Sequence, residues 1–488
     1  MKSLIPASSS KVPGLFISVM PVVFLLAFVG GVLLFSGADA ISEYSPVILL
    51  SAAVFAMVLS FADRSLSRRG LAVGFRRSAR QILPAVPMLI CISMVATTWM
   101  LSGVVPLLIT YGLGLLNPLF FLAVCCIVCG AISILTGSSW STIATIGVAF
   151  MGIGTVMGIH PGWVAGAIIS GAYFGDKVSP LSDTTVIASS SCGVDLFTHI
   201  RYLMITTVPS IVIALIVFTV AGFCISTDSV IETGSIIGQL SANFNLTPWV
   251  LVIPVVTLTM ICFRVNTLLT LLLSSLLGLA GIFVFQPAIV SYIGAGSLSD
   301  SVPAVLSMLW RETTFNTGHE VFDNLVSTSG ILGMLSTIAL VLSAMLFGTV
   351  MIGTGMLPRL THAITRKIRR RQSLVSTTVF SGLFLNSCTA DQYLSIIIGS
   401  NMFRNAYRRC GLEPRLLSRT VEDSVSVTSV LIPWNSCGIT QSSVLGVSTL
   451  VYAPYCVFNY LSPLLSIAIS ILGFKIKQTV AVPRLAKA

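Results

Sequence analysis

Charged residues are scarce in this chain: Asp, Glu, Lys and Arg together make up 9% of its 488 residues. A soluble domain carries about 25% charged residues, so this scarcity excludes an ordinary soluble protein. Acidic residues are fewer than basic ones, with 16 Asp and Glu against 27 Lys and Arg, and there are only four His. Any acid that lies inside apolar sequence is therefore the first place to look for chemistry.

Several common site patterns are missing as well. The 11 Cys lie mostly inside apolar runs, for example Cys125, Cys126 and Cys129, and their spacing fits neither a metal site nor a disulfide framework. We interpret them as small buried hydrophobic residues. The sequence has no nucleophile–base signature and no nucleotide-binding loop, which argues against an enzyme. We accordingly expect no cofactor.

Apolar residues are what the chain has in excess, at 55% with a mean hydropathy of +0.98. Runs such as 15–35 and 202–223 reach the roughly 20 residues that a helix needs to cross a bilayer. The sequence therefore predicts an all-α polytopic membrane protein surrounded by the lipid bilayer.

The net charge of +11 is compatible with nucleic-acid binding, but its placement favours a topology signal. Of the 27 Lys and Arg, 21 lie in four segments, at 63–80, 359–371, 404–419 and from 475 onward, whereas the loops between them are acidic. Lys and Arg stay on the cytoplasmic side of a membrane protein. We expect a multi-pass protein of the cell (inner) membrane with both termini cytoplasmic, and no nucleic-acid partner.

Two polar stretches, "TGSSWST" at 136–142 and "NSCTADQ" at 386–392, each lie between apolar arms. The arms of the first have no Lys or Arg at their far ends, whereas Arg clusters bracket the second. We interpret both as re-entrant hairpins, the first entering from outside and the second from the cytoplasm; two full spans are the alternative for the first. Irregular backbone at this depth is tolerated only if it is buried in protein or lines a cavity.

Short patterns recur in the two halves in the same order. "GVVPLL" at 103–108 matches "GMLPRL" at 355–360, a hairpin follows each, and "DKVSPLS" at 176–182 matches "DSVSVTS" at 423–429. The charge pattern gives the two halves opposite orientations. Inverted repeats with interrupted helices near the midplane are typical of secondary transporters, which place ion and substrate sites at the interruptions.

This repeat predicts the organisation of the chain. Each repeat would hold an arm helix, a hairpin and a broken helix, with breaks at 175–185 and 422–438, where Pro180 and Pro433 remove backbone donors. The predicted parts are N-terminal scaffold helices (1–80), repeat 1 (81–222), scaffold helices with an outer loop (223–330), repeat 2 (331–474) and a cytoplasmic tail (475–488).

Five acids lie at membrane depth: Asp176, Asp183, Asp391, Glu422 and Asp423. A charge in the bilayer core costs several kcal/mol, so such acids are functional candidates by default. The alternatives are that Asp176 pairs with Lys177, that Glu422 lies at the inner surface, and that Asp391 caps the second arm of its hairpin.

Hydroxyl, amide and carboxylate oxygens are hard ligands that suit Na⁺ or Li⁺, and we expect Na⁺ at Asp176 and Asp183. The predicted set of cation- and proton-binding residues is Asp176, Asp183, Ser179, Ser182, Thr184, Ser138, Ser139, Asp423, Glu422, Ser426, Ser429, Asn386, Thr389 and Asn435.

A carboxyl group in a low-dielectric pocket holds a proton more readily than one in water. H⁺ and Na⁺ then compete for it, and this competition couples two opposed fluxes, which is the minimal mechanism of a cation/proton antiporter. Lys177 would neutralise the ionised Asp176 when Na⁺ is absent, or pair with an anionic substrate. His199 is a candidate pH sensor near the inner surface, although a surface or cap role is the ordinary interpretation of each His.

Longer motifs resemble a known family. "GAYFGDKVSPLSDTT" at 171–185 and "GVDLFTHIRYLMITTVPS" at 193–210 are similar to the NhaC family of Na⁺/H⁺ antiporters, in the ion transporter superfamily. "TADQYLSIIIGSNMFRNAYRRCGLEPRLLSRTVEDS" at 389–424 and "IPWNSCG" at 432–438 resemble its second half.

This resemblance implies a scaffold plus a transport unit with two opposed hairpins, and homodimers that move by an elevator mechanism. Family members also exchange organic acids, such as malate against lactate, and carry amino acids. The main expectation is Na⁺/H⁺ exchange, and the alternative is Na⁺-coupled transport of a small carboxylate or amino acid.

Overall fold

The computed structural model describes residues 13–37, 40–65, 71–76, 79, 85–224, 230–263, 265–293, 298–313, 327–328, 330–365 and 371–473. Within these residues every regular element is a helix, and one isolated bridge joins Thr313 to Thr328. The predicted cytoplasmic tail at 475–488 lies outside the described residues, as do parts of the basic segments at 63–80 and 359–371.

Seven helices in the described residues are long and apolar enough to cross a membrane, and the number is ten if three sharply bent helix pairs each count as one span. This confirms the predicted class, an all-α polytopic membrane protein. The uninterrupted spans include α1 (Leu15–Ser36), α2 (Ala40–Ala62), α11 (Leu196–Cys224), α14 (Thr267–Phe285) and α18 (Gly330–Gly353). The other two, Pro118–Thr136 and Ser139–Val156, are the arms of the first predicted hairpin. Each is long and apolar enough to cross the membrane, as the alternative of two full spans requires, so the first hairpin stays a prediction.

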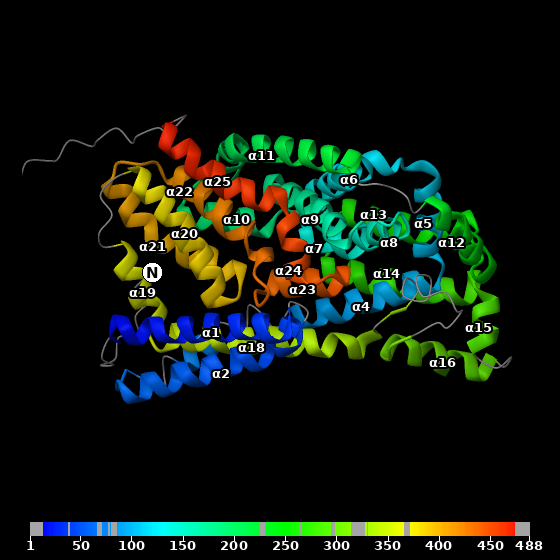
Figure 1. Ribbon diagram of the computed structural model, residues 1–488, viewed down its shortest axis with the longest axis horizontal. Helices are drawn as coiled ribbons and strands as arrows, with labels where there is room; N and C mark the ends of the chain where they lie inside the picture. The colour runs from blue at the N-terminus through cyan, green and yellow to red at the C-terminus, as the bar shows by residue number, and fades with distance from the viewer. Residues whose placement is uncertain are drawn as a thin grey trace, which may run out of the picture.

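Helices α1, α2 and α18 lie side by side along one edge of the molecule (Figure 1). Their contact is a hydrophobic cluster in which α2 contributes the small residues Ala52, Ala53 and Ala56. Small side chains at a helix contact let two backbones approach closely, which is the usual way to join helices in a membrane.

Helix α4 (Ala85–Leu101) bends by 66° into α5 (Val104–Leu115), the segment predicted as an arm helix. The bend occurs at Gly103, whose φ is +87°. A Cβ at this position would lie 2.4 Å from Nε2 of Gln286, which itself donates to the Ser102 carbonyl. Glycine is therefore required here for both its backbone angle and its size.

The segment between the two predicted repeats packs its long helix α14 against α4. The indole of Trp99 on α4 donates to the hydroxyl of Ser274 on α14 at 3.0 Å. The other elements of this segment are α12 (Val230–Asn243), η3 (Pro248–Leu251), α13 (Val252–Cys262), α15 (Pro287–Ile293) and α16 (Leu298–Trp310).

The first half contains a close helix contact, between α6 (Phe121–Thr136) and α9 (Pro161–Val178). A Cβ on Gly171 would lie 2.1 Å from the Cys126 carbonyl oxygen, and one on Gly175 would lie 2.3 Å from that of Gly130. The neighbouring elements are η1 (Pro118–Phe120), α7 (Ser139–Thr142), the π-helical segment η2 (Ile143–Gly147), α8 (Val148–Val156) and α10 (Asp183–Cys192).

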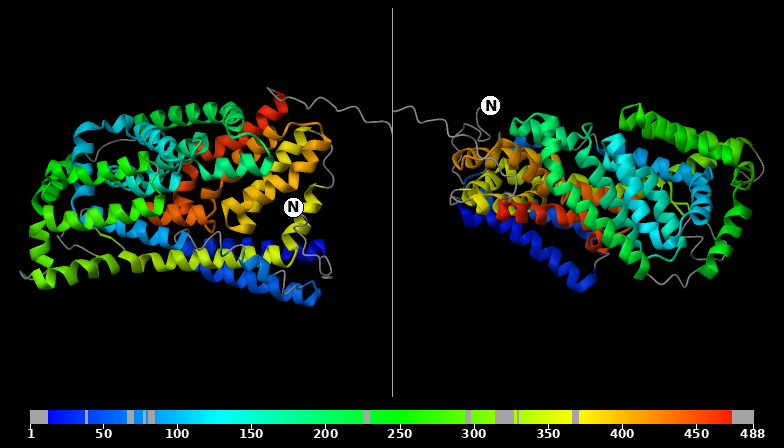
Figure 2. Two further views of the ribbon diagram at one scale, coloured as in Figure 1. Left: turned by 180° about the vertical axis from the view of Figure 1, so that it is seen from behind. Right: turned by 90° about the horizontal axis from the view of Figure 1, so that it is seen from above.

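The second half lies toward the opposite end of the long axis. In Figure 1, α20, α21 and α22 lie near one end, α5, α8 and α12 near the other, and α7, α23 and α24 between them; Figure 2 shows the same order from behind. The elements are α19 (Met356–Thr365), α20 (Arg371–Thr389), α21 (Gln392–Arg409), α22 (Pro414–Val421), the π-helical segment η4 (Glu422–Ser426), η5 (Ser429–Leu431), α23 (Ser436–Leu445), α24 (Thr449–Tyr452), η6 (Ala453–Tyr455) and α25 (Val457–Leu472).

Candidate functional site

The break between α9 and α10 brings Asp176 against residues 136–142, the predicted tip of the first hairpin. Helix α9 ends at Val178, and a turn at 180–181, flanked by the extended residues Ser179 and Ser182, leads to α10, which begins at Asp183. Ser139 Oγ at the hairpin tip donates to Asp176 Oδ2 at 2.9 Å. The break and the hairpin tip therefore meet, with Asp176 buried between them.

The predicted hydroxyls around this break are mostly used to shape it. Ser179 Oγ donates to the Ile134 carbonyl at 2.8 Å, and the Ser182 hydroxyl accepts from the Thr185 amide and contacts Thr184 Oγ1 at 2.9 Å. Ser138 caps the short helix α7 in the same way, by accepting from the Ser141 amide. These hydroxyl groups bond to backbone groups or to one another, so they fix the shape of the break that carries Asp176.

The second hairpin is tied to the second broken helix by amide side chains. Asn386 Nδ2 donates to the Val425 carbonyl at 2.8 Å, and Asn435 Nδ2 donates to the Asn386 carbonyl at 3.1 Å. Ser429 Oγ contacts Gln392 Oε1 at 3.2 Å. Three predicted cation ligands thus join the hairpin tip to the break in the described structure.

Asp391 is placed as the N-cap of α21, where its Oδ1 accepts from the Leu394 amide at 2.8 Å. Thr389 completes this tip: its hydroxyl contacts Ser395 Oγ at 2.6 Å and accepts from the Asp391 amide. This is the cap geometry that the sequence left as an alternative for Asp391.

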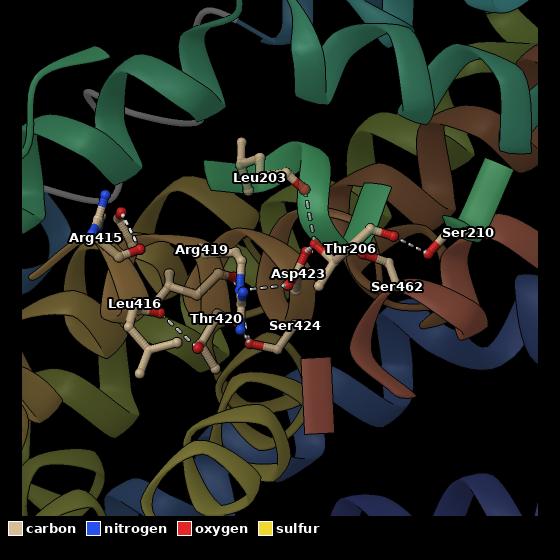
Figure 3. Close-up of polar contacts among 12 residues, drawn as sticks. Leu203, Thr206, Ser210, Arg415, Leu416, Arg419, Thr420, Asp423, Ser424 and Ser462 are labelled. Atoms are coloured by element: carbon tan, nitrogen blue, oxygen red, sulfur yellow. Dashed lines mark hydrogen bonds and ion pairs between the residues drawn. The ribbon is translucent and has the colours of Figure 1, made fainter. Parts of the chain in front are cut away.

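A buried ion pair joins the two broken helices. Figure 3 shows its acid, Asp423, with Arg419, Thr206 and Ser462 around it. Lys177 Nζ lies 2.5 Å from Asp423 Oδ1 and 2.6 Å from Ser462 Oγ, and Thr206 Oγ1 donates to the same carboxylate oxygen at 2.9 Å. The sequence offered Asp176 or an anionic substrate as the partner of Lys177, whereas in the structure its partner is Asp423. Lys177 and Asp176 are successive residues of a helix, so their side chains leave the axis about 100° apart.

A second cation lies beside Asp423. Arg419, one turn earlier, has its Nε 3.8 Å from Asp423 Oδ2 and its guanidinium 4.8 Å from the centre of the Tyr202 ring. The side chain is completely buried, and its three nitrogens make no hydrogen bond within the described part of the chain. Asp423 is therefore the shared counter-ion of two buried cations.

Glu422 has the opposite environment. It is completely buried, and neither carboxylate oxygen has a hydrogen-bond partner among the described residues. The hydroxyl of Ser426 is likewise without a partner there, and Thr184 and the charges of Asp176 and Lys177 lie near enough to influence the carboxylate. A buried carboxylate without donors is costly, so this group is suited to holding a proton or a cation.

Comparison with known proteins identifies the family of this chain. The Na⁺/H⁺ antiporter family matches residues 4–190 and 171–474 of the chain. The chain belongs to the Na⁺/H⁺ antiporter family. One relative is the Na⁺/H⁺ antiporter NhaC of Alkalihalophilus pseudofirmus, which is 35% identical over 430 residues, 88% of this chain and 89% of the relative.

Other proteins that this chain resembles have different names. A malate-2H⁺/Na⁺-lactate antiporter of Bacillus subtilis is 32% identical over 78% of this chain and 79% of its own length. An arginine/ornithine antiporter, ArcD, of Halobacterium salinarum is 33% identical over 82% of this chain and 81% of its own length. The predicted resemblance to NhaC is confirmed.

Two predicted site residues of this antiporter-family chain, His199 and Asp183, have surroundings that the sequence did not predict. His199 was expected near the inner surface, but its side chain is completely buried, with Nδ1 2.8 Å from Ser418 Oγ. Asp183 is exposed, and it lines a cavity of about 310 Å³ beside the first hairpin. Asp183 therefore contacts space that solvent can occupy, whereas Asp176 lies behind the tip.

Sequence reasoning missed the partners of the buried ion pair. The pairing of Arg419 with Asp423 could have been predicted, because the two residues are four positions apart and such side chains meet on one face of a helix. Thr206 and Ser462 carried no signal, since they come from α11 and α25 and resemble other hydroxyl residues of apolar helices. Tyr393 on α21 was missed as well, although it lies near both Asp176 and Asp183.

Proposed function

We propose that this chain exchanges Na⁺ or Li⁺ for H⁺ across the cell (inner) membrane by alternating access. The observation that supports this proposal most is Glu422, a carboxylate buried without a donor and close to Asp176. The two acids come from different broken helices. Two buried carboxylates that are near enough for their charges to interact repel each other when both are ionised, so a proton or a metal cation beside them is favoured.

The mechanism starts from Glu422 and Ser426, whose side-chain oxygens have no hydrogen-bond partner among the described residues. A Na⁺ ion entering between Asp176 and Glu422 would find their carboxylates and the hydroxyls of Ser139, Thr184 and Ser426, a set of hard oxygen ligands. Its arrival would displace the proton that otherwise neutralises the pair. Asp423 would take no part in this exchange, because Lys177 and Arg419 already neutralise it.

We further propose that the two hairpins and the two broken helices form one transport unit of inverted repeats, which moves as an elevator against a scaffold. The hydrogen bonds from Ser139 to Asp176 and from Asn386 to Val425 support movement as one body. Helices α1, α2 and α18 would be part of the scaffold. A homodimer with both termini in the cytoplasm completes the proposal, and the clustering of basic residues supports this orientation.

The test is Na⁺-dependent dissipation of a pH gradient in proteoliposomes. Asp176→Asn and Glu422→Gln should each abolish exchange while leaving the protein folded. Glu413→Gln is the matched control, since this acid pairs with Arg415 at a partly exposed position, and it should exchange like the wild type. Unchanged exchange in both site variants would refute the proposed carboxylate pair.

The second candidate function is Na⁺-coupled transport of a small carboxylate or amino acid. The names of two relatives, a malate-2H⁺/Na⁺-lactate antiporter and an arginine/ornithine antiporter, support it. The sequence offered Lys177 as the group that would meet an anionic cargo. That ammonium is bound by Asp423 and Ser462 in the structure, which favours cation exchange. Uptake of labelled malate, lactate or arginine into proteoliposomes under a Na⁺ gradient would support the second candidate.

A further inference from the structure

A polar cavity of about 310 Å³ lies beside the tip of the first hairpin. One wall comes from the hairpin, with Ser141 and Thr145, and the opposite wall from the start of α14, with Asn266 and Thr270. Asp183 supplies its carboxylate. A water molecule takes up about 30 Å³ in the liquid, so the cavity is large enough for a small ion with several of its waters.

The hairpin tip separates this cavity from the buried acid. Ser141 faces the cavity, while Ser139, two residues earlier, donates to Asp176 on the other side. Asp176 and Asp183 are close enough for their charges to interact. An ion in the cavity is therefore one short tip segment away from the carboxylate pair assigned to exchange.

The donor set favours a cation over an anion. The first turn of α14 would attract anions if its amides were free, but the Asn266 side chain already accepts from the Leu268 and Leu269 amides. The remaining polar side chains of the cavity present hydroxyl and carboxylate oxygens. A hydrated alkali cation is the ligand that such oxygens suit.

We infer that this cavity is an access site where hydrated Na⁺ is captured by Asp183 and by the start of α14 before it passes the hairpin tip to Asp176. The inference rests on the proposed Na⁺/H⁺ exchange and extends it to α13 and α14, which the sequence treated as scaffold only. It gives the two acids different tasks: Asp183 sets the apparent affinity for Na⁺, and Asp176 performs the exchange.

The experiment measures the KM and kcat for Na⁺ of purified variants in proteoliposomes at one pH. Thr270→Val removes one oxygen with little change of shape and should raise KM about fivefold, the effect of losing one polar contact. Asp183→Asn should raise KM by more and leave kcat largely intact. Asn266→Asp keeps the helix cap, adds a negative charge to the cavity and should lower KM.

Thr259→Val on α13 is the control, because that hydroxyl is exposed and bonded within its own helix. Its KM should equal that of the wild type. If the wild type exchanges Na⁺ but the three cavity variants leave KM unchanged, or if Asn266→Asp raises it, the access site is refuted while the exchange function stands. If the wild type shows no Na⁺-dependent exchange, the function itself is refuted.

Discussion

The buried ion pair allows a prediction about which single substitution should destabilise the protein most. Asp423 serves two cations, Lys177 at 2.5 Å and Arg419 at 3.8 Å, and all three side chains are at most 1% exposed. Asp423→Asn would leave both cations buried without a counter-ion. Lys177→Met would leave Asp423 with Arg419 and with hydroxyl donors, so it is the milder change.

The magnitude follows from the cost of breaking a buried pair by removing one partner, about 3–5 kcal/mol. We expect Lys177→Met near the lower end, about 3 kcal/mol, and Asp423→Asn at the upper end, about 5 kcal/mol. The double variant leaves only Arg419 unpaired, so it should be more stable than Asp423→Asn alone. This order differs from that of an isolated pair, in which either single substitution leaves one unpaired charge.

The assay is denaturant unfolding in detergent, followed by tryptophan fluorescence, with the free energy of unfolding compared between variants. Glu413→Gln serves as the control, because a partly exposed ion pair contributes about 0–1 kcal/mol. If Asp423→Asn destabilises no more than Lys177→Met, or if the double variant is the least stable of the three, the shared counter-ion is refuted.

Three further predictions use other parts of the molecule. Gly171→Ala should destabilise the protein by about 1–3 kcal/mol, because the added carbon meets a backbone oxygen of α6, whereas Gly114→Ala has open space and should be neutral in the same unfolding assay. Asp391→Ala should lower the free energy of unfolding by about 1 kcal/mol, because the N-cap of α21 is lost. Asp391→Ser keeps a capping oxygen, so it should restore the stability and keep full exchange. Loss of exchange in Asp391→Ser would instead indicate that this acid is an ion ligand. The KM for Na⁺ should rise as the pH falls, approaching tenfold per unit in the acid limit for a one-proton competition, while kcat stays constant; a falling kcat with constant KM would contradict competition at Asp176 and Glu422.

Much of this protein was determined by the sequence alone, because the features concerned are local. The scarcity of charge and the long apolar runs predict the spanning helices, since the bilayer admits only segments that bond their own backbone. Pro180 and the polar residues around it predict the interruption between α9 and α10. The contact of Ser139 with Asp176 was within reach as well, because both lie at predicted interruptions.

Only the tertiary structure decided how the buried charges are divided. Glu422 and Asp423 are neighbours in the sequence and look equivalent there, but successive side chains of a helix point in different directions. One carboxylate faces Lys177, Thr206 and Ser462, and the other has no partner among the described residues. Lys177 and Thr206 are 246 and 217 residues from Asp423 along the chain, and Ser462 is 39 residues from it. The choice between counter-ion and exchange site therefore depends on packing and cannot be read from the motif.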